Sequence, residues 1–351
     1  MRILILGGTG AIGSSVCKQL AEYENCEVFV TSRVSHESHN RIYFIKGDAL
    51  NDITTILNSE YDVIIDFMSY STNAFASRIK FLLDHTKHYI FISSSRVFAK
   101  SELPIKSCSD RLLNTINDQK YLQTDEYALT KARQEDMLVQ SGVRNYTIIR
   151  PYITYNKNRL QLGVMEKEEW LYRLLHGRTI LLPFEMMDRK TTMTSSEDVA
   201  RFIVSIIGRT DAQGKKFNVT SSDVRTWKEL LEIYSNTIKK KLCLDVKVKY
   251  LSTEDYLNCI GCSRKYQLIY DRYYDRVFDT SEIVNYIDIN SCVSPEQGLS
   301  ECVSSFLETP KFKNIKWNFE IEKDKLTKEI AHPNELPGFK LKAKYYYNRF
   351  K

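Results

Sequence analysis

Long apolar runs are absent from this chain of 351 residues. Its longest runs fall far short of the ~20 residues that a helix needs to cross a bilayer, so we expect no membrane partner. The first apolar strand begins at Arg2, which leaves no room for a secretory signal. Internal repeats and low-complexity linkers are lacking as well. Together, these absences predict a folded cytoplasmic protein.

Grouped metal ligands are also scarce. Cys259 and Cys262 have a zinc-like spacing, but no second cysteine pair or histidine cluster accompanies them. We therefore expect no metal, because a turn of small residues explains the pair better. In the cytoplasm, the eight cysteines are expected to be free thiols.

Acidic residues are missing from 340–351. There, basic residues surround Tyr345–Tyr347, namely Lys340, Lys342, Lys344, Arg349 and Lys351. Basic residues interleaved with aromatic ones can bind RNA or an acidic partner. The net charge of the whole chain, however, is a modest +6. We interpret this segment as a solvated tail and expect no nucleic-acid partner.

Glycine is concentrated at the beginning of the chain. Four of the 13 glycines follow the apolar run 2–6 within seven residues, namely Gly7, Gly8, Gly10 and Gly13. Without a Cβ, glycine permits positive φ and lets a pyrophosphate approach the backbone amides. The positive end of the following helix would face the phosphates. Strand, glycine turn and helix together predict dinucleotide binding, although a tight turn alone would use the same glycines.

Apolar strands alternate with helical patterns through the N-terminal half. The predicted strands are 27–31, 42–45, 63–68, 89–93 and 146–150, and helical spacing lies between most of them, as at 77–85 and 126–141. Near-continuous apolar strands predict an α/β fold with a Rossmann-like, doubly wound parallel sheet covered on both faces. Ligands of such a sheet bind beyond the carboxyl ends of its strands.

The chain is longer than most single domains, which predicts one large domain with a lobe, or two domains. After Pro151 the pattern changes to helices at 167–175, 197–207 and 227–239 and a short strand at 246–251. We predict a dinucleotide-binding Rossmann domain over 1–155. Residues 156–310 would form mostly a smaller C-terminal substrate-binding lobe, with some segments returning to the sheet. Residues 311–351 would form a basic C-terminal extension.

Hydroxyl groups and a Tyr–Lys pair occupy positions that suit catalysis. Ser93–Ser95 follow the apolar run 89–92, so their hydroxyls are predicted at the carboxyl edge of a central strand. Tyr127 and Lys131 are four residues apart, which places both on one face of a helix. Each pattern alone is common in proteins of other functions. Their conjunction with the glycine turn favours a catalytic interpretation.

With these residues, the chain resembles the extended short-chain dehydrogenase/reductase family, in its nucleotide-sugar epimerase and dehydratase group. Gly7, Gly10 and Gly13 match the cofactor loop of that family. Ser94 matches its catalytic Ser/Thr, and Tyr127 and Lys131 match its Tyr-x-x-x-Lys pair. The similarity continues in order through Arg150-Pro151, the helix start at 198–200 and, more loosely, 276–283.

Three segments depart from the family pattern. Asp66–Ser69 replace the usual His-Leu-Ala-Ala, and Thr192–Thr194 lack the His that often precedes the Asp-Val-Ala helix. Arg272–Asp275 match only partly an Arg-x-x-Asp pair that grips the nucleotide diphosphate in some relatives. These differences resemble an atypical branch with chloroplast stem-loop-binding proteins, some of which bind RNA. They affect the expected substrate more than the expected fold.

The resemblance implies a hydride-transfer site with a nicotinamide cofactor. Tyr127 would exchange a proton with the substrate oxygen, Ser94 would hold that oxygen, and the Lys131 ammonium would favour the phenolate. A tyrosine pKa near ~10 makes this help necessary at neutral pH. The residues expected to bind the cofactor are Gly7, Thr9, Gly10, Ala11, Ile12, Gly13, Ser32, Arg33, Asp48, Ala49, Phe67, Met68, Tyr127, Lys131 and Pro151.

The end of the second strand bears on the choice of cofactor. Arg33 with Ser32 suits a 2′-phosphate and favours NADP(H), whereas an arginine that stacks on adenine would also fit NAD(H). Asp48 resembles the family aspartate that contacts adenine, or it caps a helix. Contacts to the sugar and diphosphate of the substrate are expected from polar residues farther along, namely Ser95, Asn156, Arg159, Arg189 and Arg272.

The sequence thus predicts an NAD(P)-dependent enzyme that acts on a nucleotide sugar, either an epimerase or a 4-ketoreductase. Family frequency favours the epimerase, and Arg33 favours the reductase. A dehydratase is disfavoured, because Ser95-Arg96 replace the Asp-Glu pair that eliminates water in such relatives. The alternative is a non-catalytic NADP- or RNA-binding protein of the same fold. The resemblance also implies a homodimer.

Overall fold

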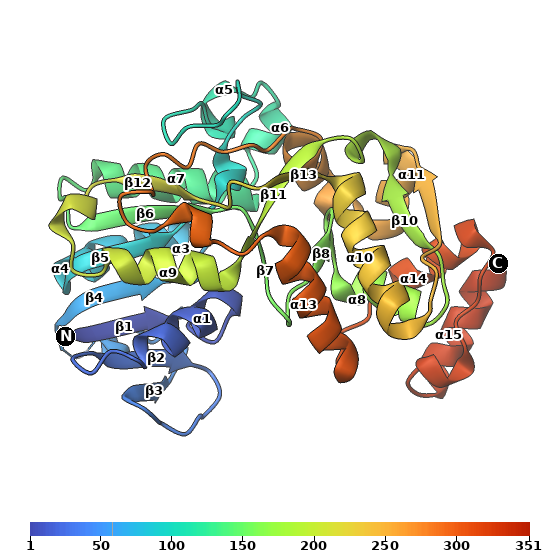
Figure 1. Cartoon of the computed structure of the whole chain (residues 1–351), viewed down its shortest axis with the longest axis horizontal. Helices are drawn as coiled ribbons and strands as arrows, with labels where there is room; N and C mark the ends of the chain where they lie inside the picture. The colour runs from blue at the N-terminus through green and yellow to red at the C-terminus, as the bar shows by residue number, and fades with distance from the viewer. Residues whose placement is uncertain (58) are drawn as a thin grey trace. The chain divides into compact units, whose positions relative to one another are not determined.

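A computed structural model describes residues 1–57 and 59–351 (Figure 1). The chain divides into two compact units. Unit 1 comprises Met1–Tyr155, Thr192–Val224 and Arg276–Ser294, and unit 2 comprises Asn156–Thr191, Arg225–Asp275 and Pro295–Lys351. Each unit is therefore assembled from three separate segments of the chain.

Unit 1 contains a seven-stranded sheet with the strand order β12-β6-β5-β4-β1-β2-β3. All neighbouring strands are parallel. The strands are β1 (Arg2–Leu6), β2 (Glu27–Ser32), β3 (Ile42–Lys46), β4 (Tyr61–Asp66), β5 (Thr86–Ile92), β6 (Tyr146–Pro151) and β12 (Lys216–Val219). From β1 the chain extends to β3 in one direction and through β4 to β6 in the other, as in doubly wound Rossmann folds. The predicted fold class is confirmed.

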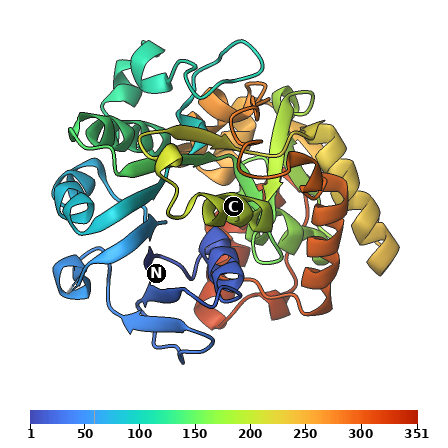
Figure 2. The same cartoon turned by 60° about the vertical axis from the view of Figure 1, so that its left-hand side comes forward.

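Helices cover both faces of this sheet, as Figure 2 shows. One face packs against α1 (Ala11–Leu20) and α9 (Ser196–Ile206). The other packs against α2 (Ile53–Ile56), α3 (Thr72–Ala76), α4 (Ile79–Asp84) and α7 (Tyr127–Gln140). Within β1, Ile3 and Ile5 face the first set and Leu4 and Leu6 the second, because successive strand side chains point to opposite faces.

α1 and α9 lie far apart in the sequence but pack side by side. The hydroxyls of Ser15 and Ser196 are 3.0 Å apart, and the Gln19 amide donates to the Glu197 carbonyl at 2.9 Å. Unit 1 also contains α5 (Leu112–Thr115), α6 (Gln119–Leu122) and β7 (Ile153–Tyr155). β7 pairs in parallel with β11 (Lys190–Ser195).

Unit 2 is mainly helical. Its helices are α8 (Lys167–Leu175), α10 (Trp227–Leu242), α11 (Thr253–Ile260), α12 (Lys265–Gln267), α13 (Pro295–Glu308), α14 (Trp317–Thr327) and α15 (Phe339–Phe350). β8 (Gln161–Leu162) pairs with β9 (Met165–Glu166), and β10 (Ile180–Pro183) with β14 (Val248–Leu251). β13 (Val224–Thr226) begins at the last residue of a unit 1 segment. Within residues 1–57 and 59–351, the structure contains no helix that is both long and apolar enough to cross a membrane.

Buried ion pairs hold α14 inside unit 2. Arg173 of α8 donates to Glu320 at 2.8 Å and to Asp324 at 2.7 Å. Arg178 donates to the other Asp324 oxygen at 3.1 Å. All four side chains are buried. Because a buried charge without its partner is costly, these pairs tie residues within 311–351 to the rest of the unit.

Candidate functional site

The glycine turn between β1 and α1 is packed tightly. Gly7 has a φ of +73°, in the left-handed region that favours glycine. A Cβ on Gly13 would lie 2.7 Å from the Cα of Gly8, and a Cβ on Gly8 would lie 2.8 Å from the Val30 side chain. Any larger residue at these positions would collide with the turn or with β2.

The open side of the turn is at Gly10, the N-cap of α1. The nearest group to a Cβ at Gly10 would be the Gly7 carbonyl oxygen, 3.5 Å away, and Thr9 and Gly10 are exposed. No acidic residue lies in the first turn of α1, so none in that turn offsets its positive end. An exposed helix N-terminus behind a close-packed glycine turn fits a phosphate group. The predicted cofactor residues Gly7, Thr9, Gly10, Ala11, Ile12 and Gly13 therefore lie where a phosphate can approach this helix N-terminus.

Two more predicted cofactor residues lie where β2 ends. Ser32 is buried, and its hydroxyl accepts from the Val34 N–H at 3.2 Å. Arg33 is exposed, and within the described part of the chain it forms no ion pair. A guanidinium in this setting is accessible to an anionic ligand.

The predicted residues after β3 form a small turn. The Asp48 carboxylate accepts from the Leu50 N–H at 3.0 Å and from the Asn51 amide at 2.9 Å. Ala49 is buried beside it. Asp48 thus organises its own turn, while its side chain stays partly accessible. It does not cap the next helix as the alternative interpretation expected, because Asp52 is the N-cap of α2.

Met68 contacts both Lys131 of α7 and the glycine turn. The Lys131 ammonium donates to the Ile92 carbonyl at 2.8 Å and to the Met68 carbonyl at 3.3 Å. The Met68 sulfur lies 3.0 Å from where a Gly7 Cβ would be, and Phe67 lies 3.5 Å from it. The predicted cofactor residues Phe67 and Met68 therefore form a wall between the two.

The charge of Lys131 is set by opposing effects. Burial lowers its pKa to about 8, while the carboxylates of Asp66 and Glu135 oppose that fall. Its ammonium also lies 4.4 Å from the centroid of the Phe91 ring. Near neutral pH the Lys131 side chain is therefore largely protonated, and a modest rise in pH above its pKa of about 8 would remove the proton.

Tyr127 and Ser94 lie at the same end of the sheet as Lys131. The centroid of the Tyr127 ring is 6.0 Å from the Lys131 ammonium and 5.4 Å from the guanidinium carbon of Arg96. The Ser94 hydroxyl accepts from the backbone N–H of Arg96 at 3.2 Å. Tyr127 is 39% exposed, so its ring is accessible to a substrate. The Tyr127 ring thus lies near both Lys131 and Arg96, and Ser94 and Lys131 each contact the backbone at or just after the end of β5.

Asp66 is a neighbour of this site that the sequence analysis did not assign. Its carboxylate accepts from the hydroxyls of Tyr70 at 2.9 Å and Tyr89 at 2.7 Å, and from the Met68 N–H at 2.9 Å. Burial raises its pKa, although these donors and Lys131 act in the opposite direction. Asp66 therefore fixes the segment whose carbonyl holds Lys131. The sequence signal for Asp66 was a carboxylate at the end of an apolar strand. The sequence analysis treated it only as a departure from the family pattern.

Glu135 is a second unassigned neighbour, one helical turn after Lys131. It accepts from the Arg150 guanidinium at 2.7 and 2.6 Å and from the Ser93 hydroxyl at 2.6 Å. Burial alone would raise the pKa of Glu135, but Arg150 and Ser93 reverse this, and the pKa is lowered. These contacts fix the ends of β5 and β6 against α7, next to the predicted Pro151. The four-residue spacing from Lys131 was its signal.

The predicted substrate residues have different environments. Ser95 is buried and donates to the Arg150 carbonyl at 2.8 Å. In unit 2, Asn156 accepts from backbone N–H groups of its own turn, and the Arg159 guanidinium lies 3.7 Å from a glutamate of β9. Arg272 is buried and donates to the Gly163 carbonyl at 3.0 Å, whereas Arg189 is exposed.

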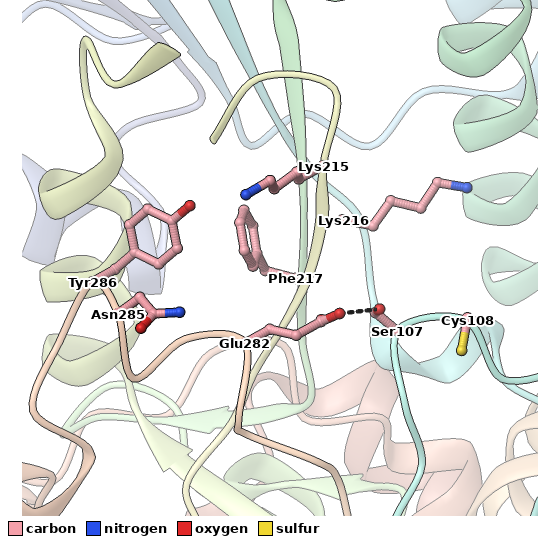
Figure 3. Close-up of a pocket in the computed structure, with 8 residues that line it drawn as sticks. All are labelled: Ser107, Cys108, Lys215, Lys216, Phe217, Glu282, Asn285 and Tyr286. Carbon is pink, nitrogen blue, oxygen red and sulfur yellow. Dashed lines mark hydrogen bonds between the residues drawn. The ribbon is translucent and has the colours of Figure 1, made fainter. Parts of the chain in front are cut away.

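A pocket of about 410 Å³ lies elsewhere in unit 1, at the edge strand β12 (Figure 3). Its lining includes Lys215, Lys216 and Tyr286, and across it the Ser107 hydroxyl donates to Glu282 at 2.8 Å. β6, β5 and β4 separate β12 from the strand that carries the glycine turn. None of the predicted site residues lines this pocket, so we do not assign it to the cofactor site.

Comparisons with known proteins bear on the family and the fold of this chain. A family model described as NAD(P)H-binding matches residues 7–210. No protein of curated function matches the chain in sequence.

Solved structures match over most of the chain. UDP-glucuronic acid 4-epimerase from Bacillus cereus, in complex with UDP-glucuronic acid and NAD, has a TM-score of 0.67 at 16% identity, covering 89% of this chain and 100% of that one. dTDP-glucose 4,6-dehydratase from Bacillus anthracis, in complex with NAD, has a TM-score of 0.64 at 16% identity, covering 88% and 97%. UDP-N-acetylglucosamine 4-epimerase from Methanobrevibacter ruminantium has a TM-score of 0.61 at 17% identity, covering 88% and 98%. At these identities the likeness shows the fold.

Proposed function

Since the chain belongs to the NAD(P)H-binding family and has the fold of extended short-chain dehydrogenase/reductase proteins, we propose that it is a nucleotide-sugar epimerase or 4-ketoreductase. The observation that carries the proposal is the meeting of Lys131 and the glycine turn at Met68, with the Tyr127 ring beside the ammonium. Two of the named neighbours are epimerases of UDP-linked sugars. The proposal places the protein in the cytoplasm and, by analogy with the family, in a homodimer.

The residues fit distinct parts of a dinucleotide. The glycine turn and the first turn of α1 would hold the diphosphate, and Lys131 would bind near the nicotinamide end. When bound, the nicotinamide exchanges a hydride with a carbon of the substrate. Arg33, exposed at the end of β2, supports a preference for NADP(H) over NAD(H) as part of this proposal.

Tyr127 is the proposed acid and base. Its ring lies beside the Lys131 ammonium, and a nearby cation of this kind would favour the phenolate over the phenol. Arg96 also lies beside the ring, but its guanidinium is paired with the Glu126 carboxylate at 2.5 Å. The phenolate would accept the proton of a sugar hydroxyl, and the phenol would return it to the carbonyl oxygen. Ser94 would donate a hydrogen bond to the same oxygen as its charge develops. Asp66 and Glu135 act indirectly by fixing Lys131 and the strand ends.

Cofactor balance separates the two reactions. An epimerase returns the hydride to the same sugar and produces no net change in nicotinamide absorbance. A 4-ketoreductase consumes NADPH stoichiometrically as a 4-keto sugar is reduced. The accessible Arg33 supports the reductase, and the two neighbouring epimerases support the epimerase.

The test is a panel of UDP- and dTDP-sugars, incubated with the purified protein with and without NADPH and followed by NMR and absorbance. Turnover of one sugar is expected, and Tyr127→Phe is expected to abolish it while dinucleotide affinity stays within about twofold. Tyr250→Phe, at an exposed position of β14, is the matched control and should keep full activity. Undiminished turnover by Tyr127→Phe would remove the proposed acid and base. Salt-sensitive RNA binding without sugar turnover would instead favour the non-catalytic alternative.

A further inference from the structure

The last helix of unit 2 is α15 (Figure 1). Its inner face is fixed by specific contacts. The Tyr345 side chain is fully buried, and its hydroxyl accepts from the Ala331 N–H at 2.8 Å. The Arg349 guanidinium donates to the Glu329 carbonyl at 2.8 Å. Since these contacts fix the rotation of the helix about its axis, the residues of its outer face are set by the fold.

That outer face carries an aromatic stripe. Phe339 is 84% exposed, Tyr347 67% and Phe350 68%, and Ala343 between them is also exposed. At about 100° per residue, these four side chains fall within an arc of about 80°, roughly opposite the buried Tyr345. Folded proteins seldom leave several large aromatic side chains aligned on one exposed surface unless the surface binds something.

Lysines border the aromatic stripe on both sides. Lys340, Lys344 and Lys351 follow one border, and Lys342 lies beyond the other. Within the residues that the structure describes, Lys340, Lys342 and Lys344 form no ion pair. No acidic residue occurs in α15. The face therefore offers uncompensated positive charge around an apolar centre.

We propose that the outer face of α15 docks this protein on an anionic membrane surface. Phe339, Tyr347 and Phe350 would enter the boundary between lipid headgroups and acyl chains, as in interfacial amphipathic helices. The bordering lysines have long apolar stems and would reach the lipid phosphates from the edge of the stripe. The helix would lie in the plane of the membrane.

Charge and shape favour this occupant over two others. A second copy of the chain would bring two sets of like-charged lysines together, which opposes pairing of this face with itself. Single-stranded nucleic acid is usually held in a basic groove with stacking platforms, whereas this stripe follows the convex side of a single helix. A flat anionic surface matches both the alignment of the rings and the flanking charge.

This inference departs from the expectations of a solvated tail and of no membrane partner. The expectation of no membrane partner rested on the absence of an apolar run long enough to span a bilayer, and a helix that lies on the surface needs no such run. The expectation of a solvated tail rested on the modest net charge of the whole chain, which does not describe the local charge of α15. The inference does not depend on the proposed enzymatic function, because α15 contains none of the residues assigned to the cofactor site.

The test is sedimentation of the full chain with vesicles of phosphatidylcholine alone or mixed with phosphatidylglycerol. The unmodified chain is expected to bind only the anionic vesicles. The triple variant Phe339→Ser, Tyr347→Ser, Phe350→Ser should lose roughly tenfold or more of that affinity, and so should Lys340→Glu, Lys344→Glu. Circular dichroism and NADPH binding should be unchanged in both variants, which separates this test from the enzymatic proposal.

A matched control removes three aromatic side chains of similar exposure elsewhere. Tyr23, Phe184 and Tyr250 are 49%, 58% and 50% exposed, and their replacement by Ser should leave vesicle binding intact. Equal loss in this control, or no binding of the unmodified chain to anionic vesicles, would overturn the proposal. A lower oligomeric state of the stripe variant in light scattering would assign the face to a second copy. Binding to polyuridylate in place of vesicles would assign it to nucleic acid.

Discussion

Replacement of Gly13 by alanine has two opposing effects on stability: a gain in helix propensity and a steric clash with Gly8. Inside a helix, alanine is favoured over glycine by ~1 kcal/mol, so the substitution in α1 would ordinarily stabilise the protein. Here, however, the new Cβ would lie 2.7 Å from the Gly8 Cα and 2.8 Å from its carbonyl carbon. Both distances are well below 3.4 Å, the shortest ordinary van der Waals contact. Both Gly8 atoms belong to the backbone, so no flexible side chain can move aside.

The clash should decide the sign. Overpacking of a close-packed site costs roughly 1–3 kcal/mol, which exceeds the helical gain. We expect Gly13→Ala to lower the midpoint of thermal unfolding by a few degrees and to weaken NADPH binding, because the turn must open. Differential scanning fluorimetry and calorimetric titration with NADPH measure the two effects.

Gly10→Ser is the matched variant. Its backbone is extended, with φ −75° and ψ 179°, and serine is a preferred N-cap residue, so stability should hold. The nearest group to a new Cβ lies 3.5 Å away, but the side chain would occupy the side that a diphosphate approaches. Affinity for NADPH should fall about tenfold or more while the unfolding midpoint stays unchanged. A higher midpoint for Gly13→Ala, or undiminished NADPH affinity of Gly10→Ser, would refute this account of the turn.

Three further predictions concern charged groups. Asp66→Asn should move the pKa of Lys131 below its value of about 8, because a carboxylate that favours the ammonium is lost; NMR of ¹³Cε-labelled lysine would show an earlier titration, and an unchanged midpoint would contradict the coupling. Glu135→Gln should cost roughly 3–5 kcal/mol in chemical denaturation, because it leaves the buried Arg150 unpaired. In the unmodified chain the pKa of Glu135 is lowered, so its contribution to the free energy of unfolding is present above pH 4.5 and is lost as the pH falls through the folded-state pKa. A free energy of unfolding that does not fall at acidic pH would contradict the ion pair. Arg33→Ala should weaken NADPH binding roughly tenfold and leave NADH binding unchanged; equal effects on both in calorimetry would remove the 2′-phosphate assignment.

The sheet was predictable because its strands carry a local signal. Apolar runs such as 63–65 and 89–93 are buried on both faces, and short-range helical spacing separates them. The edge strand β12 was not predicted, since Lys216–Val219 is short and begins with a charged residue. Its place beside β6 results from long-range packing, which no local pattern encodes.

The site was predictable in part for the same reason. Tyr127 and Lys131 are related by helical spacing, which a sequence displays directly. The contacts of Asp66 with Tyr70 and Tyr89 join separate elements, and their register emerges only when β4 and β5 pair. The C-terminal segment shows a further limit, because the burial of Tyr345 depends on Asp324 and Ala331.

The packing of α9 on α1 has a consequence for synthesis of the protein. Ser196 meets Ser15 across 181 residues of sequence, and at 5–20 residues per second a ribosome needs roughly 10–40 s to bridge that interval. Throughout that time one apolar face of the nascent sheet lacks its second covering helix. Chaperone supply and slower translation at low temperature should therefore govern the yield of folded protein during recombinant expression.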